Sequence, residues 1–224
     1  MKKTIITGSE GTIGKSITPF LKSKGYEIIP LDIRATPSFN LLTDNLTPFL
    51  KGAKYFIHLA ANPDPRIKEK DARKNFDMTQ RIIEQLETPN SLELIINASS
   101  INVYDYLAIF DNGRKIDRKT SLSPNMKWGD GSYAKYKIES EKILSDYCKK
   151  KQISLINLRI GCVTPNEELP RNTEGKIDPV NFDIFLEHYD MREIAYQSLH
   201  KKGIHSYVCV SKKDGFIDKD ILFH

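Results

Sequence analysis

The chain of 224 residues has few cysteines and no long apolar run. Its three cysteines, Cys148, Cys162 and Cys209, are odd in number and widely spaced, which argues against a disulfide framework and against a metal site. No stretch approaches the roughly 18 consecutive apolar residues of a membrane-spanning helix, and a predicted strand begins where a signal peptide would stand. We therefore expect reduced thiols, a cytoplasmic location, and neither a metal nor a membrane partner.

A strong excess of one charge is also missing. The net charge is +5, and only Lys149, Lys150 and Lys151 form a basic run. Charge spread in this way is typical of a solvated surface rather than of a nucleic-acid-binding face, so no nucleic-acid partner is expected. With 39% hydrophobic residues, the chain has enough apolar side chains for a sizeable core.

Apolar runs that suit strands alternate with segments of helical periodicity. Strands are predicted at residues 3–7, 26–31, 54–59, 92–97, 154–160 and 205–210, and helices at 12–24, 43–50, 67–86, 132–150 and 180–199. The alternation is typical of an α/β fold with a Rossmann-type doubly wound parallel sheet. Residues 104–131 are expected to form a long irregular segment, and such segments in compact domains are usually functional.

Three glycines, Gly8, Gly11 and Gly14, stand at the turn from the first predicted strand into the first predicted helix. A backbone without side chains can approach a pyrophosphate there, and the unpaired N–H groups of the helix start can bind its charge. Asp32 ends the second predicted strand, where a carboxylate can accept hydrogen bonds from an adenosine ribose. This favours NAD over NADP as the cofactor. NADP stays an alternative, because the guanidinium of Arg34 can bind a 2′-phosphate. The simpler alternative is a tight turn with no ligand.

Small and polar residues follow the next two predicted strands. Ala60 and Ala61 leave room for a flat ligand, and Ser99 and Ser100 come to the same edge of the sheet. Open α/β sheets bind ligands along this edge. The edge is therefore the expected site.

Tyr133 and Lys137 lie four residues apart and share one face of the predicted helix 132–150. A free tyrosine, with a pKa of about 10, is a poor base at neutral pH. A lysine ammonium one turn away and a positive nicotinamide would favour the phenolate, while a serine hydroxyl holds the substrate oxygen. Taken alone, the pair also fits a tyrosine at the core edge beside a solvated lysine. The glycine turn and the serine pair favour the catalytic interpretation.

Five motifs occur in the order found in extended short-chain dehydrogenases/reductases, the NAD-dependent epimerase/dehydratase group, which nearly the whole chain resembles. They are Thr7-Gly8-x-x-Gly11-x-x-Gly14, His58-Leu-Ala-Ala61, Ala98-Ser-Ser-Ile-Asn-Val-Tyr104, Tyr133-x-x-x-Lys137 and Leu158-Arg-Ile-Gly161. The resemblance implies NAD as cofactor and a homo-oligomer built around helices 67–86 and 132–150. It also implies that residues 1–160 form the NAD-binding Rossmann domain, with 161–224 as a small C-terminal substrate-binding region that is not an independent domain.

The resemblance assigns roles to individual residues. The catalytic set that it implies is Ser100, Tyr133, Lys137 and Asn75, the last as support for a proton relay. The cofactor set that it implies is Gly8, Gly11, Thr12, Ile13, Gly14, Asp32, Ile33, Asn40, Leu41, Leu59, Ala60, Ala61, Lys137 and Cys162. Asn40 stands where the family has an acid that contacts adenine. His58 is expected to be a packed strand residue.

Within this group the chain is similar to uronate dehydrogenases, which oxidise the anomeric carbon of hexuronic acids to a lactone. The stretch from Arg159 to Pro165, followed by Arg171, is similar to their pattern with its later arginine for the substrate carboxylate. The substrate contacts implied are Ser100, Asn102, Val163 and Arg171. Where those enzymes have Ser-Ser-Asn-His, this chain has Ser-Ser-Ile-Asn, so one polar contact is lost or displaced to Asn102.

Three functions stay open. The first is an NAD-dependent dehydrogenase that oxidises a hexuronate or related aldose at the anomeric carbon. The second is a nucleotide-sugar epimerase or dehydratase with internally recycled NAD, against which the short segment after Gly161 argues. The third is a non-catalytic dinucleotide sensor, since fold alone does not establish function. The intact Ser100, Tyr133 and Lys137 argue against the sensor.

Overall fold

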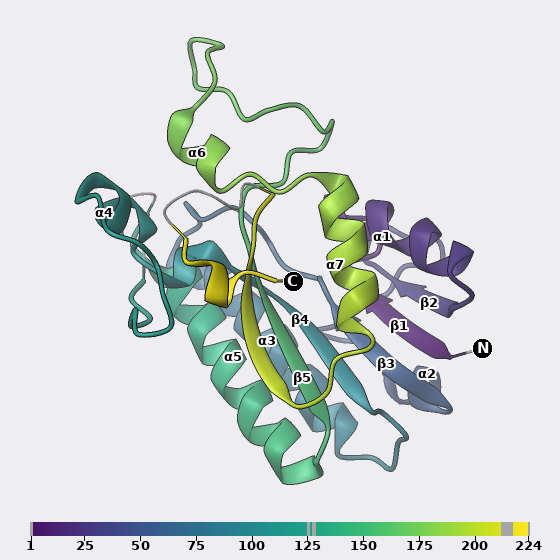
Figure 1. Cartoon of the computed structure of the whole chain (residues 1–224). Coiled ribbons are helices and arrows are strands. Elements are labelled where there is room, and N and C mark those ends of the chain that lie inside the picture. The colour runs from purple at the N-terminus through teal and green to yellow at the C-terminus, as the bar shows by residue number, and fades with distance from the viewer. Residues whose placement is uncertain (1, 125, 127–128, 212–216, 224) are drawn as a thin grey trace.

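The computed structural model describes residues 2–124, 126, 129–211 and 217–223. Its centre is a six-stranded parallel sheet with the strand order β2-β1-β3-β4-β5-β6 (Figure 1). The strands are β1 (Lys3–Thr7), β2 (Glu27–Leu31), β3 (Ala53–His58), β4 (Leu94–Ser100), β5 (Ser154–Ile160) and β6 (Ile204–Cys209). Strand β6, from the region predicted to bind substrate, thus completes the same sheet as the N-terminal strands.

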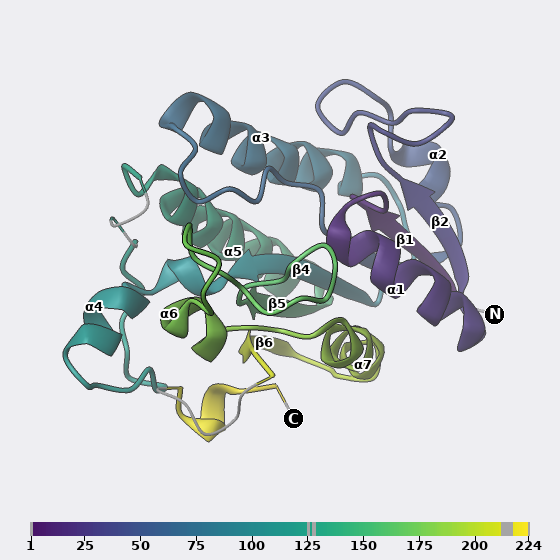
Figure 2. The same cartoon turned by 90° about the horizontal axis from the view of Figure 1, so that it is seen from above.

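Helices cover both faces of the sheet. The helices of the described residues are α1 (Thr12–Ser23), α2 (Thr47–Leu50), α3 (Glu69–Leu86), α4 (Tyr106–Asp111), α5 (Ser132–Lys151), α6 (Pro179–Asp183) and α7 (His188–Ser198), of which α4 and α6 lie away from the sheet. Figure 2 shows α3 and α5 side by side on one face, and α1 and α7 together on the other. This arrangement confirms the predicted doubly wound Rossmann-type fold.

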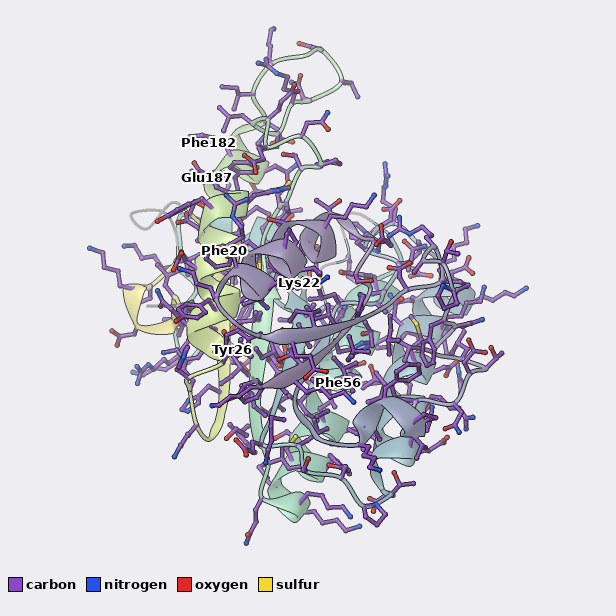
Figure 3. The ribbon with its side chains drawn as sticks, turned by 90° about the vertical axis from the view of Figure 1, so that its right-hand side faces the viewer. Phe20, Lys22, Tyr26, Phe56, Phe182 and Glu187 are labelled. Carbon is purple, nitrogen blue, oxygen red and sulfur yellow. The ribbon has the colours of Figure 1, made fainter. Side chains whose placement is uncertain are left out.

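The sheet is buried on both faces because its strands carry apolar residues without alternation. In β1, Ile6 packs with Ile17 of α1 and Ile194 of α7, whereas its neighbour Ile5 packs with Ile82 of α3 on the opposite face. Phe20 of α1 packs against the core that contains Ile6 and lies next to α7 (Figure 3), with its ring centroid 6.3 Å from that of Tyr196. Two apolar layers therefore hold the sheet between its helices.

The direction of strand order changes between β1 and β3. From β1 the chain passes through α1 to β2 at one edge, and it then crosses back to β3 on the other side of β1. In open α/β sheets, ligands bind beyond the carboxyl ends of the strands at such a switch point. The glycine turn after β1 and the alanines after β3 lie at this point.

The prediction of one continuous helix over residues 180–199 was wrong. Two helices, α6 and α7, are separated by an extended stretch in which the Cys162 N–H donates to Ile184 O (2.8 Å) and the Leu186 N–H donates to Cys162 O (2.8 Å). A Cβ on Gly161 would lie 1.9 Å from Ile184 O, so only glycine permits this close approach. These long-range backbone pairings interrupt the helical pattern.

Two shorter elements also differ from expectation. The predicted helix 43–50 is helical only at Thr47–Leu50, because the Asn40 carbonyl accepts from the N–H groups of Thr43 and Asp44 in a preceding turn. The segment 104–131, of which residues 125, 127 and 128 lie outside the described part, contains α4 rather than irregular chain alone. Apolar residues of α4 pack with residues 217–223, which we call the C-terminal segment. The periodicity of the sequence does not predict this long-range contact.

Candidate active site

The glycine turn after β1 leaves no room for side chains. Gly8 has a φ of +76°, and a Cβ on it would lie 2.6 Å from the backbone N of Ala60. A Cβ on Gly14 would lie 2.3 Å from Gly8 O, and one on Gly11 would lie 3.2 Å from the same oxygen. The turn therefore presents bare backbone, as the approach of a pyrophosphate requires.

The start of α1 is suited to an anion. No side chain in the described part of the chain caps this end of the helix, and its first turn, which includes Thr12 and Ile13, has no acidic residue. The Ser9 hydroxyl is buried in the turn without a hydrogen-bond partner among the described residues. Unpaired donors at a helix N-terminus bind phosphate groups, so these residues fit the pyrophosphate of a dinucleotide.

Asp32 is held at the edge of this turn. It is 6% exposed, its Oδ2 accepts from the Glu10 N–H (2.9 Å), and its Oδ1 accepts from the Arg34 N–H (2.8 Å). The Arg34 side chain also reaches the turn, since a Cβ on Gly11 would lie 3.7 Å from its Nη2. The acid and the arginine thus lie together where a ribose would bind.

The residues assigned to adenine differ in their surroundings. Ile33 is 62% exposed beside Asp32, whereas Leu41 is buried in the core. The Asn40 side chain accepts from the Leu42 N–H (3.0 Å) and stabilises the local turn. Contacts of these residues with a cofactor stay a prediction, and Ile33 is the one with free apolar surface.

The structure brings Ser100, Tyr133 and Lys137 together at the end of β4 and the start of α5. All three are buried. Lys137 Nζ donates to the carbonyl of Ala98 (2.7 Å) and lies 5.8 Å from the centroid of the Tyr133 ring. The Ser100 side chain is close enough to the phenol of Tyr133 for hydrogen bonding to lower the pKa of the tyrosine. The tyrosine is thus flanked by a hydroxyl donor and an ammonium.

Burial opposes the ionisation of both titratable groups. The pKa of Tyr133 is raised to about 12, mainly by burial. The Ser100 side chain acts to lower this pKa, whereas the Asp64 charge raises it further. Burial also lowers the pKa of Lys137 to about 8, against the raising effect of the Glu141 carboxylate. The expectation of a lowered tyrosine pKa does not hold for the protein groups alone, because desolvation outweighs the effect of Ser100.

Asn75 and His58 fix the segments that flank the site. The Asn75 amide accepts from the Asn62 N–H (2.8 Å) and donates to Asn62 O (3.0 Å), which holds the loop after β3. His58 Nδ1 lies 2.9 Å from Thr7 Oγ1, and burial lowers the pKa of this histidine to about 3. His58 is therefore a neutral packed strand residue, as predicted. The relay role of Asn75 stays a prediction.

Backbone pairing holds the cofactor-edge residues after β3 and β5. The Leu59 N–H donates to Thr7 O (3.0 Å), which places Ala60 and Ala61 beside the glycine turn. The backbone of Cys162 pairs with that of Phe185 in an isolated parallel β-bridge. Contacts of these residues with a cofactor stay a prediction.

The predicted substrate residues lie in different surroundings. Asn102 donates to Ser100, and Val163 packs partly against the core next to Cys162. Arg171 is exposed in a hairpin, where it pairs with Ile177 and its guanidinium donates to Gly175 O (2.6 Å). Both of these contacts lie within the hairpin of Arg171, and its role at the substrate stays a prediction.

Two residues near the site were missed by sequence reasoning. Ser9 lies between the motif glycines, and only its buried, unpaired hydroxyl reveals it. Glu141 is buried on the same helix face as Lys137 and forms an ion pair with Arg159 (2.7 Å). The spacing of four residues between Lys137 and Glu141 was a signal that could have found it.

Metal and membrane features are not evident in the residues that the structure describes. Within residues 2–124, 126, 129–211 and 217–223, histidine, cysteine, aspartate and glutamate side chains form no group of three or more that could hold a metal ion. In the same ranges, none of the helices is long and apolar enough to cross a membrane.

A family model described as the NAD dependent epimerase/dehydratase family matches residues 4–177. The chain belongs to this family. The family's cofactor is NAD, which confirms the cofactor predicted from the glycine turn. Among curated proteins, none matches the chain by sequence.

Solved structures share the fold at low sequence identity. Uronate dehydrogenase from Agrobacterium tumefaciens has a TM-score of 0.73 and 17% identity, over 98% of this chain and 81% of that one. UDP-N-acetylglucosamine 4-epimerase from Bacillus cereus has a TM-score of 0.74 and 20% identity, over 94% of this chain and 76% of that one. UDP-glucuronic acid 4-epimerase from the same organism, in complex with UDP-glucuronic acid and NAD, has a TM-score of 0.68 and 18% identity, over 94% and 78%. Dehydrogenases and epimerases are thus both similar in fold.

Proposed function

We propose that this protein is an NAD-dependent dehydrogenase that oxidises a sugar hydroxyl, with a hexuronate or related aldose oxidised at its anomeric carbon. The observation that carries the proposal is the buried group of Ser100, Tyr133 and Lys137 beside the switch point. Base, hydroxyl donor and ammonium are the groups needed to remove a proton from an alcohol. The likeness in fold to a uronate dehydrogenase supports the substrate class.

The chemistry divides among these side chains. Ser100 donates a hydrogen bond to the reacting oxygen, and the Tyr133 phenolate takes the hydroxyl proton as the carbonyl forms. Bound NAD would supply the acceptor for the hydride that leaves the same carbon. Lys137 contributes a positive charge that favours the phenolate. The glycine turn, Ser9 and Asp32 would hold the pyrophosphate and ribose.

Arg171 carries the finer proposal of a uronate. A guanidinium can bind a carboxylate through two parallel hydrogen bonds and orient the sugar ring. Its hairpin follows Cys162 and Val163 at the carboxyl end of β5, and Figure 1 shows this segment rising beyond the sheet on the side of the site. The ratio of kcat/KM for uronates to that for the neutral parent sugars should fall in Arg171→Ala. An unchanged ratio would remove the carboxylate role.

The test of the proposed function is net formation of NADH. The purified protein is mixed with NAD and, separately, with uronic acids, neutral sugars and nucleotide sugars. A dehydrogenase reduces NAD with a free sugar, and Tyr133→Phe should lower that rate about 10²–10⁴-fold while leaving NAD binding intact. Retention of more than about a tenth of the rate in Tyr133→Phe would show that another group is the base.

A nucleotide-sugar epimerase with internally recycled NAD is the second candidate, because two epimerases share the fold over 94% of this chain. It would interconvert UDP-sugars without net NADH. A dinucleotide sensor would bind NAD and convert none of the sugars. The same panel therefore separates the three functions.

A further inference from the structure

Asn102 donates two hydrogen bonds to the hydroxyl of Ser100. Its backbone N lies 3.2 Å and its side-chain Nδ2 lies 3.1 Å from Ser100 Oγ. The short 3-10 helix η1 (Ile101–Val103) follows β4 directly, and Ser100 is its N-terminal cap, so both donors are held in place. A serine hydroxyl has two lone pairs and one proton. Asn102 therefore occupies both lone pairs.

The proton is the only part of the Ser100 hydroxyl left for another partner. The side chains of Ser100 and Tyr133 are close enough to interact, and a hydrogen bond donated by Ser100 lowers the pKa of Tyr133 and so favours its phenolate. In the proposed reaction, the Ser100 hydroxyl donates its hydrogen bond to the substrate oxygen while Tyr133 takes the proton from that oxygen. Donors fixed in advance toward a developing negative charge need no reorganisation during the reaction, which is the source of their catalytic effect.

We propose that Asn102 is a positioning residue that makes Ser100 a donor only, directed at Tyr133 and at the reacting oxygen of the substrate. The catalytic part of this inference rests on the proposed dehydrogenase function. The hydrogen-bond arrangement itself does not require turnover.

A packing role alone does not explain this asparagine. Asn102 Oδ1 is buried and finds no hydrogen-bond partner in the part of the chain that the structure describes. An unpaired buried acceptor costs about 1–3 kcal/mol, which a leucine of similar size would avoid. If Asn102 only filled space, Asn102→Leu would leave function intact. If it orients Ser100, the same change should lower the rate without lowering stability.

The kinetic test is a double-mutant cycle with Ser100→Ala. Asn102→Leu should lower kcat about 10-fold and leave the KM for NAD unchanged, a smaller loss than the roughly 100-fold that follows removal of a donor to a developing charge. In the Ser100→Ala background it should cause no further loss. Asn112→Leu is the matched control, because the Asn112 amide donates to Ala108 O away from the site. An equal loss in both backgrounds, or no loss at all, would overturn the inference.

A second measurement does not depend on turnover. The protein is labelled with ¹³C at the tyrosine Cζ, and the Tyr133 resonance is assigned by its loss in Tyr133→Phe. Ser100→Ala and Asn102→Leu should shift this resonance in the same direction, and the double variant should shift it no further. If no sugar is oxidised but this coupling appears, the proposed function fails and the positioning role stands. If Asn102→Leu leaves the resonance in place, the positioning role fails.

Discussion

Lys137 is 8% exposed, and its ammonium donates a hydrogen bond to the carbonyl of Ala98. Burial lowers its pKa from 10.5 to about 8, whereas the Glu141 carboxylate acts in the opposite direction. A charged group kept in such a place lowers stability unless it is paired. Its presence beside Tyr133 is consistent with a site in which function outweighs stability.

Lys137→Met should therefore stabilise the cofactor-free protein at neutral pH. Below pH 8 the Lys137 ammonium is charged in both the folded and the unfolded protein. Burying this charge then lowers the unfolding free energy by about 3 kcal/mol, the value that corresponds to the pKa shift from 10.5 to about 8. Between pH 8 and 10.5 the folded state loses its proton first, so the cost fades as the pH rises. Denaturant unfolding of both proteins at pH 7 and pH 10 measures this.

Lys142→Met, an exposed lysine on the same helix, is the control and should change stability little at either pH. A stability difference for Lys137→Met that stays constant between pH 7 and pH 10 would show that burial does not shift its titration.

Asp32 predicts the preference between cofactors. Its carboxylate is held by two backbone N–H groups at the edge of the glycine turn, where it would repel a 2′-phosphate. We expect NAD to bind at least tenfold more tightly than NADP, a difference of about 1.4 kcal/mol. Arg34→Ala should widen the preference by removing the cation beside Gly11. Calorimetric titration with NAD and with NADP measures the two affinities. Equal affinities would mean that the attraction of Arg34 for the 2′-phosphate outweighs the repulsion by Asp32.

At the scale of elements, a buried ion pair joins α5 to β5. Arg159 Nη2 lies 2.7 Å and Nε 3.0 Å from the two Glu141 oxygens, and Tyr104 accepts a further hydrogen bond from the same guanidinium. The two side chains are 13% and 8% exposed. Since α5 carries Tyr133 and Lys137, this pair also holds the helix of the candidate site against the sheet.

Breaking this pair should destabilise the protein strongly. Glu141→Gln leaves a buried guanidinium without its counter-charge, for which we expect a loss of about 3–5 kcal/mol in unfolding free energy. Glu84→Gln breaks the exposed pair with Arg81 and should cost less than about 1 kcal/mol. Urea unfolding compares the two variants, and similar small losses would show that the buried pair contributes little.

At the scale of the whole molecule, the C-terminal segment connects distant parts of the fold. The Asp218 N–H donates to Ile116 O (2.7 Å), and the Phe223 N–H donates to Val208 O of β6 (3.1 Å). The Phe223 ring is buried, with its centroid 5.1 Å from that of Tyr207. The segment thus covers the edge of the sheet and joins it to the 104–131 segment.

Phe223→Ala should lower the unfolding free energy by about 3 kcal/mol, because it removes a buried ring and leaves a cavity. Phe182→Ala, at a 36% exposed position on α6, should cost less than about 1 kcal/mol. Chemical denaturation of the two variants makes the comparison. A loss for Phe223→Ala no larger than that for Phe182→Ala would mean that the C-terminal segment does not stabilise the fold.

Local patterns in the chain were sufficient to predict the fold class, the glycine turn and the placement of Tyr133 and Lys137 on one helix. The strand 3–7, the three glycines and the following helix occupy neighbouring positions, and their structure follows from backbone geometry and periodicity. Tyr133 and Lys137 share a helix face because their spacing matches the helical repeat. The family model over residues 4–177 confirms the family that the order of the motifs predicted.

Contacts between distant residues account for what those patterns did not predict. The break between α6 and α7 depends on backbone pairing of Cys162 with Ile184 and Leu186. The pKa of Tyr133 depends on burial, which the spacing of its motif does not report. Asn102 also reaches Ser100 only because η1 folds it back over the end of β4. Periodicity describes neighbours along the chain, whereas desolvation and long-range pairing arise only when the chain is folded.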